Sequence, residues 1–520
     1  MSNNRPVVGR GVTRRTFSLG IGAVASYALL NGPKSSARAA EPKQGGHLRI
    51  AIARGDTSDN LDPSILNNTH PINVTWQLRN NLVEIGANSE AVPELAESWE
   101  PSKDAKTWHF KLRKGVMFHN GKTFDAEDAA YSINYHTRPG SKSGAAGFLS
   151  DVESVKSDGS DTLVVTLKNG NADLPYMLGD YHLQVVPAGT TDFSDGMGTG
   201  GYTLVEYEPG VRALVKRNPN YWKAGRAHVD EIETLVIADD NARTTALRTN
   251  QIDVMNAVDL KTIGLLKRVA EVKILEMTGK KHYTLPMLTD RAPYNNPDVR
   301  MALKLAINRQ ELLDKVLAGH GALGNDQPIA ASNRFFAQLP QREYDPEQAR
   351  SLIKKAGMEN TVFQLHAADA AFAGAVDTAT LFQAHAAAAG IKIEVVREPN
   401  DGYWSNVWRK KDFAMAYWSG RPTEDWMFSS AYQTGASWND SNWSNPRFDE
   451  VLKLARAELD DSKRAELYKE AQLLVRDDGG VIIPMFANDV IAHRQNVMYD
   501  KPSAAWELDG LRCGERWWFA

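Results

Sequence analysis

The sequence predicts an α/β protein with more than one domain. Strand-like and helix-like patterns alternate along the chain, and neither an internal repeat nor a low-complexity linker interrupts them. The length of 520 residues suggests two or three domains, since a domain usually takes about 150 residues. These observations favour a chain that folds around more than one hydrophobic core.

In the first half of the chain, three strands are predicted where apolar residues alternate with other residues. They are marked by Leu48, Ile50 and Ile52, by Trp108, Phe110 and Leu112, and by Leu163, Val165 and Leu167. Between the second and third strands, Asn120-Gly121 predicts a turn and Asp125 predicts the start of a helix. Ala126, Ala129, Ala130 and Ile133 share one face of that helix, which indicates a buried face.

In the second half, proline at the first helical position marks three helix starts. Asn296-Pro297 begins a helix that we expect to stop at Gly319. Asp345-Pro346 begins another, which Gly357 closes. A third starts at Asn445-Pro446.

The N-terminus has the pattern of an export signal. Arg14-Arg15 precede a modestly apolar stretch over 19–30, and Ala37-Arg38-Ala39 offers small residues for cleavage. Residues 1–39 are therefore predicted to be a twin-arginine-type signal peptide, with an ordinary general-secretion signal as the alternative. The apolar stretch is too short to span a bilayer, which takes about 20 apolar residues. Both signals predict an exported protein that is soluble after cleavage.

Composition and motifs exclude several functional classes. The net charge of −4 gives no basic balance for binding nucleic acid. The 12 histidines form no His-Glu-x-x-His pattern, and the only cysteine, Cys513, is expected to be a packed side chain rather than a reactive or lipid-bearing thiol. Five residues separate Gly115 from Gly121 where a phosphate loop needs four between its glycines, and no Gly-x-Ser-x-Gly elbow occurs. We therefore assign no catalytic residue, metal or cofactor.

Several long phrases of the sequence resemble one known family. They are SWEPSKD and FKLRKGVMFHNGKTF within 93–136, Leu61-Asp62-Pro63, GTGGY at 198–202 followed by RNPNYW at 217–222, and DVRMALKLAINR at 298–309. In these phrases the chain is similar to the dipeptide/oligopeptide/nickel class (family 5) of extracytoplasmic solute-binding proteins, which feed ABC importers. Gly201 stands where that family usually has proline. The resemblance covers almost the whole mature chain.

The resemblance implies a bilobed periplasmic-binding-protein fold of type II, in the large cluster whose first lobe carries an inserted subdomain. Carried onto this chain, lobe one comprises 41–87, 198–280 and 488–520, the insertion 88–197, and lobe two 281–487. The two crossings between the lobes are expected near Lys281-His282-Tyr283 and Phe486-Ala487-Asn488.

The resemblance also implies a function. It predicts a monomeric receptor in a Gram-negative periplasm that closes around a small molecule and delivers it to an ABC permease in the inner membrane. The twin-arginine translocase would be its partner during export. A secreted hydrolase, such as a peptidase or glycosidase, is the alternative, and a surface adhesin is a third class.

The main predicted ligand contact is Arg421. It lies in a Ser-Gly-Arg-Pro turn after a strand over 413–418, at the end of the strand where α/β proteins usually bind ligands. In peptide-binding family members, an aspartate stands three residues after the tryptophan that matches Trp418 and pairs with the ligand's amino group. A guanidinium at this place favours a carboxylate or phosphate. We assign Tyr417 and Trp418 to the same site, and a solvated turn arginine or an interlobe salt bridge is the alternative for Arg421.

The ligand is therefore predicted to be zwitterionic or anionic. Candidates are a modified amino acid, an opine, a glutathione-like acidic peptide and a metal–aminocarboxylate chelate. We expect Trp404, Trp418 and Trp438 to lie near the cleft that closes around it.

Other site candidates come from the resemblance. Asp369 and His366 belong to a strand at 363–366 and the loop before an alanine-rich helix at about 372–389, and Asp369 has a helix cap as its alternative role. The remaining candidates are His282 and Tyr283 at the first crossing, Tyr181 and His182 beside Asp180 in an insertion loop, and Trp438 with Asn439. For each of these, packing or simple surface exposure is the alternative.

Overall fold

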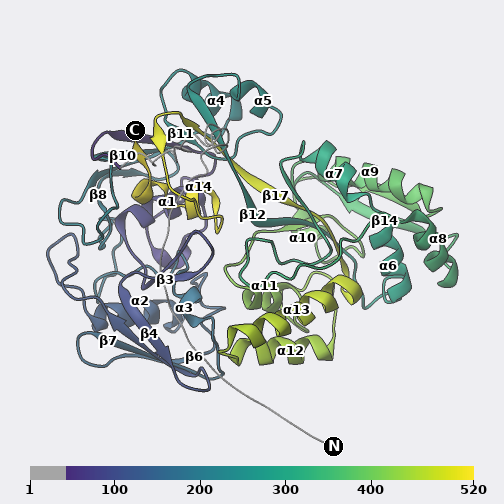
Figure 1. Ribbon diagram of the computed structural model, residues 1–520, viewed down its shortest axis with the longest axis horizontal. Coiled ribbons are helices and arrows are strands. Elements are labelled where there is room, and N and C mark those ends of the chain that lie inside the picture. The colour runs from purple at the N-terminus through teal and green to yellow at the C-terminus, as the bar shows by residue number, and fades with distance from the viewer. Residues whose placement is uncertain (1–41) are drawn as a thin grey trace, which may run out of the picture. The chain divides into compact units, whose positions relative to one another are not determined.

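A nine-stranded sheet organises the structure, a computed structural model that describes residues 42–520 (Figure 1). The predicted signal segment, 1–39, lies outside the described residues. The strand order is β16 (Ala416–Trp418), β12 (Val272–Pro286), β17 (Val481–Arg494), β11 (Val254–Met255), β1 (His47–Ile52), β10 (Glu231–Val236), β9 (Arg212–Arg217) and β8 (Tyr202–Glu208), with β13 (Gly321–Leu323) paired to β17. β1 is the strand predicted from Leu48, Ile50 and Ile52, and it pairs in parallel with both β10 and β11.

The two longest strands, β12 and β17, connect two groups of elements. They pair antiparallel from Val272 opposite Arg494 to Pro286 opposite Val481, and the register shifts between Thr278 and His282. In Figure 1 they run from the side of α1 (Thr69–Leu78) and α14 (Glu507–Gly510) to the side of α6 (Pro297–Leu305) and α9 (Ala375–Ala388). Both segments expected to cross between lobes lie within these strands.

A separate four-stranded sheet has the order β4 (Ala96–Pro101), β5 (Thr107–Leu112), β7 (Thr162–Leu167) and β6 (Val152–Ser157). It confirms the predicted strands around Trp108 and Leu163. The predicted helix is α2 (Ala126–Thr137), and Asp125 caps it in a capping box, in which its carboxylate accepts N–H bonds from Glu127 and Asp128. The buried side chains of this sheet and helix form a hydrophobic cluster drawn only from 82–185. A second cluster draws only on 283–487, so each segment has its own core.

Helix starts in the second half were predicted better than helix ends. Asp345 caps α8 (Pro346–Lys355), Gly357 follows it in the left-handed conformation, and Asn445 caps α12 (Pro446–Ala457), as expected. The prediction of a single helix between Asn296 and Gly319 is wrong. It is two helices, α6 and α7 (Arg309–Val316), because the Asn308 side chain accepts the Glu311 N–H at 3.1 Å and starts a new helix.

Two further boundaries differ from expectation. The alanine-rich helix α9 begins at Ala375 rather than near 372, because Gly374 adopts a left-handed conformation (φ 85°) immediately before it. The strand expected over 413–418 is regular only as β16. Phe413 and Ala414 instead make isolated bridges to Met287 and His366.

The remaining elements complete the chain. Those before β12 are η1 (Pro63–Ile65), β2 (Val83–Ile85), β3 (Ala91–Pro93), α3 (Leu174–Met177), α4 (Asp240–Arg248) and α5 (Ile263–Leu266). Those after it are β14 (Val362–Ala367), β15 (Lys392–Arg397), α10 (Tyr403–Asn406), α11 (Glu424–Ala431), α13 (Asp461–Asp478), β18 (Val497–Met498), α15 (Cys513–Arg516) and β19 (Trp518–Phe519). β14 confirms the strand predicted at 363–366.

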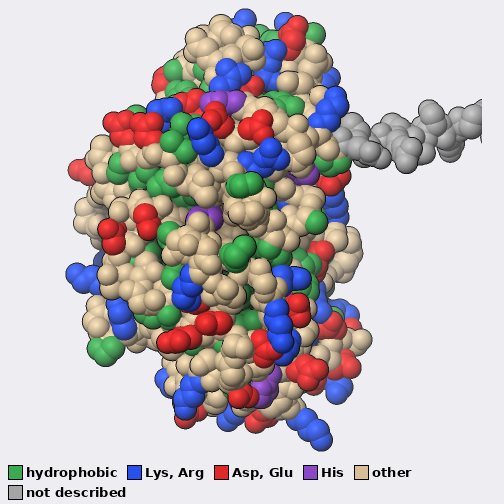
Figure 2. All heavy atoms as spheres, turned by 90° about the vertical axis from the view of Figure 1, so that its left-hand side faces the viewer, with side chains coloured by type: hydrophobic (Ala, Val, Ile, Leu, Met, Phe, Trp, Pro, Cys, Tyr) green, Lys and Arg blue, Asp and Glu red, His purple; other side chains and the backbone are tan. Residues whose placement is uncertain are grey.

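Two sequence expectations about the surface and the cysteine can be compared with the structure. On the face shown in Figure 2, Lys and Arg are interspersed with Asp and Glu rather than gathered by sign. Cys513 is fully buried, and this burial raises the pKa of its thiol to about 12, which confirms a packed, neutral side chain. None of the helices within 42–520 has both the length and the apolar character that a bilayer span requires.

Candidate functional site

Strand alternation in β12 decides which residues of the first crossing face the site. Side chains of successive strand residues point to opposite faces, so Lys281 and Tyr283 share one face and His282 takes the other. Tyr283 lies directly opposite Tyr417 of β16. Its ring also stacks on Phe372, with centroids 3.8 Å apart, which brings the loop after β14 to the same place. The carboxyl ends of β14 and β16 therefore meet at Tyr283.

His282 is buried in this structure, close enough to Arg421 for the guanidinium to affect the pKa of its imidazole, and its assignment as a ligand contact stays a prediction. Its side chain is 0% exposed, its ring lies 5.2 Å from that of Phe486, and its Nδ1 is 3.0 Å from the Lys280 carbonyl oxygen. Burial lowers its pKa to about 4, so the imidazole is neutral at physiological pH.

Arg421 lies after β16, with its guanidinium over the Trp418 ring at 5.5 Å. Its Nη1 donates to the Ser419 carbonyl oxygen at 3.0 Å, and it makes no salt bridge with any carboxylate in 42–520. Burial lowers the pKa of Arg421, while Tyr181, Asp180 and Tyr417 are near enough to raise it. The guanidinium is therefore half-buried, faces the 180–181 loop, and keeps donors that no described side chain uses.

The 180–181 loop lies on the side of the site that Arg421 faces. The Tyr181 ring lies 6.2 Å from Trp506, whose ring lies 5.3 Å from Trp76. His182, in contrast, is buried, and its Nδ1 lies 2.6 Å from the Asp180 carboxylate. His182 thus packs within its own segment and its assignment as a lining residue stays a prediction, while Tyr181 and Asp180 are near enough to Arg421 to raise its pKa.

Charged residues of the crossing strands and of the C-terminal segment also belong to the site. Lys281 Nζ lies 3.7 Å from the Asp489 carboxylate of β17. Glu507, at the start of α14, is near enough to influence the pKa of both groups. Eight side chains thus form a series in which each member neighbours the next, and we call them the site ring: Arg421, Tyr417, Tyr283, Lys281, Asp489, Glu507, Trp506 and Tyr181.

The members of the site ring keep contact with solvent although most are partly buried. Tyr417 is 36% exposed, and the side chains of Lys281 and Asp489 are 38% and 19% exposed. Lys281, Asp489, Glu507 and Trp506 were not among the candidates from the sequence. Strand alternation could have indicated Lys281, because it shares the face of Tyr283.

The other predicted residues of the 283–487 segment lie around this ring or away from it. Asp369 is exposed and accepts the Val376 N–H at 3.3 Å, which supports its alternative role at the start of α9. His366 is 8% exposed, and its Nδ1 lies 2.6 Å from Glu398. Their side chains are thus engaged within their own segment, although Phe372 of the same loop reaches Tyr283.

Trp418 and Trp438 form an aromatic pair beside Arg421. Their rings are 6.1 Å apart, Trp438 is 51% exposed, and the buried Trp418 donates its indole N–H to Asp440 at 3.1 Å. Asn439 is buried, and its amide donates to the Trp443 carbonyl at 2.8 Å. Asn439 therefore holds its own loop together in this structure, and its assignment as a ligand contact stays a prediction.

The segment around α3 contacts α12 and α13 beside the site. Ala172 N–H donates to the Arg456 carbonyl at 2.8 Å, and the buried Asp173 pairs with Arg464 at 2.5 Å. Arg334 also donates to the Tyr176 hydroxyl at 2.8 Å. These contacts hold the 82–185 unit against helices of the 283–487 segment, so the two sides of the site ring are brought together.

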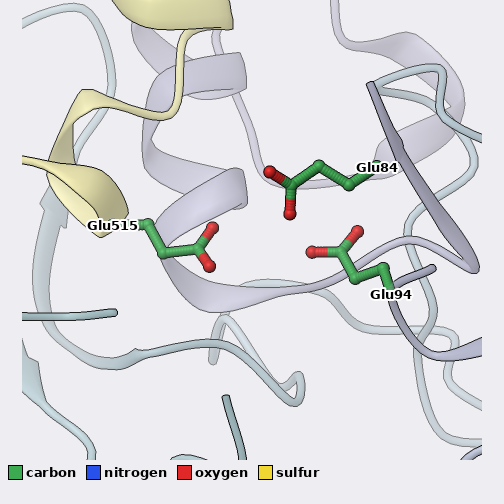
Figure 3. Close-up of side chains that lie close together, drawn as sticks. All are labelled: Glu84, Glu94 and Glu515. Carbon is green, nitrogen blue, oxygen red and sulfur yellow. The ribbon is translucent and has the colours of Figure 1, made fainter. Parts of the chain in front are cut away.

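Three buried glutamates that are not part of the site ring, Glu84, Glu94 and Glu515, point toward one another (Figure 3). Lys223 Nζ forms ion pairs with all three, and Arg512 and Arg516 add pairs to Glu94 and Glu84 at 2.7 and 2.6 Å. Burial would raise the pKa of Glu84, but Lys223 and Arg516 hold it well below its usual value. Cations of the chain thus already neutralise these carboxylates, and the group is explained as a buried ion network.

Comparison with known proteins identifies a family. The family model "Bacterial extracellular solute-binding proteins, family 5 Middle" matches residues 90–440. The dipeptide-binding protein of Escherichia coli is 28% identical over 78% of this chain and 83% of its own length. The glutathione-binding protein GsiB of Pectobacterium atrosepticum is 26% identical over 81% of this chain and 85% of its own length.

Solved structures show the same fold. The structure of HbpA2 from Haemophilus parasuis covers 89% of this chain and 98% of its own, with a TM-score of 0.80 and 22% identity. The predicted bilobed α/β fold of type II is thereby confirmed.

Proposed function

The chain belongs to the family 5 bacterial extracellular solute-binding proteins, which deliver solutes to ABC importers, and we propose that its own solute is a small zwitterionic or anionic organic molecule. The observation that carries this proposal is Arg421, a half-buried guanidinium without a carboxylate partner in 42–520, set among Tyr417, Trp418 and Tyr181. Such a group favours a carboxylate or phosphate on the solute.

The names of the relatives support the same ligand class. Dipeptides and glutathione, for which two relatives are named, carry both an ammonium and at least one carboxylate. A modified amino acid, an opine and a metal–aminocarboxylate chelate share these features. Family membership favours binding without turnover over the secreted hydrolase that the sequence left open.

The lobes are proposed with the boundaries drawn from the sequence. Lobe two, 281–487, contains the whole of the 283–487 hydrophobic cluster, and the insertion, 88–197, contains most of the 82–185 cluster. Lobe one would comprise 41–87, 198–280 and 488–520. β12 and β17 would be the hinge, because the segments at both expected crossings lie in them.

Binding is expected to stabilise the protein and to close the lobes. A solute identified by mass spectrometry after copurification, added at about a hundredfold excess over Kd, should stabilise the folded state by roughly 2.7 kcal/mol. It should also change the fluorescence of Trp404, Trp438 and Trp418. Thermal unfolding and fluorescence titration measure these effects, and intact recovery of the solute distinguishes binding from hydrolysis.

Small-angle scattering tests the hinge separately. The contacts of Asp173 with Arg464 and of Ala172 with Arg456 can form only when the insertion meets lobe two. Compaction on adding a solute that binds would support closure. A solute that binds without any change in the scattering curve would count against a hinged receptor.

Export by the twin-arginine route to a Gram-negative periplasm is proposed from Arg14-Arg15. Replacing both with lysine should leave the precursor in the cytoplasm, as cell fractionation and immunoblotting would show. Normal processing of the double variant in a strain that lacks the twin-arginine translocase would assign export to the general-secretion route instead. The exported protein is proposed to act as a monomer with an inner-membrane ABC permease as its partner.

A further inference from the structure

We propose that Asp489 receives an ammonium group of the solute, within the same site ring as Arg421, so that the site holds a zwitterion by both ends. This inference rests on the proposed function, because it places a solute within the site ring. It assigns the amine to a residue of the crossing strand β17.

Asp489 lies beside an irregularity in the ladder between β12 and β17. Its partner in the ladder is Met277, and the register of β12 shifts immediately afterwards, between Thr278 and His282. Gly279 lies within this irregular stretch, and a Cβ there would come 2.9 Å from Asp489 Oδ2. A side chain at 279 would displace the carboxylate, so glycine leaves the space that Asp489 occupies.

The carboxylate of Asp489 has acceptor capacity that the described residues do not use. An ionised carboxylate can accept about four hydrogen bonds. Neither oxygen of Asp489 accepts one from any donor in 42–520, and Lys281 Nζ at 3.7 Å is beyond hydrogen-bond distance. The side chain is only 19% exposed, so water can supply few of the hydrogen bonds that the protein does not donate to this carboxylate. Burial and the nearby Glu507 raise its pKa to about 6, while Lys281 lowers it.

Unlike Asp489, the neighbouring carboxylates have close hydrogen-bond or ion-pair partners. Glu507 accepts from Thr69 Oγ1 and Asn256 Nδ2, both at 2.8 Å. Glu276 lies 2.7 Å from His320 and within reach of Lys267. Since their oxygens already have partners, Asp489 is the acceptor that an incoming ammonium would meet.

Asp489 and Arg421 are not neighbours within the ring. From Asp489 the ring passes through Lys281 and Tyr283 of β12 to Tyr417 and then to Arg421. The tyrosine pair between the charges offers apolar surface to the middle of a solute. A molecule with an anion at one end and a primary ammonium at the other matches this order.

Glutathione and N-acetylglutathione, which lacks the ammonium, test the inference by calorimetric titration. The wild type should bind glutathione at least about 30-fold more tightly than the acetylated form. Asp489→Asn, which keeps the shape, should abolish this preference by weakening only glutathione. Gly279→Ala should do the same by displacing the carboxylate. Asp230→Asn, at an exposed carboxylate of the β9–β10 edge, is the control and should keep the preference.

The outcomes separate the inference from the proposed function. Equal binding of both probes by the wild type, or an undiminished preference in Asp489→Asn, would overturn the assignment of Asp489 while leaving a solute receptor intact. Binding of neither probe by the wild type would reject a glutathione-like zwitterion as the solute class, and the assignment of Asp489 would fall with it. Arg421→Ala should weaken both probes while keeping the preference between them.

Discussion

Replacing Lys223 with methionine is expected to lower the free energy of unfolding by about 3–5 kcal/mol. Lys223 Nζ lies 3.2 Å from both Glu94 and Glu515 and pairs with Glu84, and all three glutamates are almost completely buried. Without the shared ammonium, buried negative charge would keep only the arginines as partners. Denaturation in urea followed by tryptophan fluorescence measures the loss.

The control for this prediction is Lys216→Met. Lys216 is 58% exposed and pairs with Glu231 at 3.5 Å on the surface, so its replacement should cost less than about 1 kcal/mol. A similarly small cost for Lys223→Met would contradict a stabilising role of the network. If the glutamates instead held a divalent cation, a chelator would shift the wild-type unfolding midpoint, and we expect no such shift.

This network illustrates what the sequence could not predict. Its members come from 84–94, from Lys223 and from 512–516, and no local spacing links segments so far apart. Local signals worked where one short segment determines the result. The Asp125 capping box and the Asn120-Gly121 turn are set by residues within a few positions of each other, and the structure has both.

The helix between Asn296 and Gly319 shows a limit of local signals as well. An apolar face continues through Ala306 and Ile307, so periodicity alone favours one helix. Asn308 can continue a helix weakly or cap a new one, and the buried packing of both pieces selects the cap. Tertiary context, rather than propensity, decided this boundary.

The candidate site was predicted in part for similar reasons. The resemblance located the crossing segment 281–283, but it could not say which of these consecutive side chains faces the site. Strand parity places Lys281 and Tyr283 together and buries His282. Asp489 and Trp506 come from the C-terminal part of the chain and carried no sequence motif, so only the fold brings them to the site ring.

Arg421→Ala is expected to weaken binding of the natural solute by about 30-fold or more. The guanidinium is half-buried and already lacks a carboxylate partner, so removing it leaves the anionic end of the solute desolvated without a counter-charge, at a cost of about 2–5 kcal/mol. Arg421→Asp should weaken binding further, because it adds repulsion of the anion. Arg421→Lys should lie between, since lysine keeps the charge and loses the two-pronged geometry. Calorimetric titration measures each affinity.

Arg397→Ala, at an exposed arginine of β15, is the control and should bind like the wild type. An unchanged affinity in Arg421→Ala, or a natural solute that is a cation without carboxylate or phosphate, would show that Arg421 is instead a solvated turn residue.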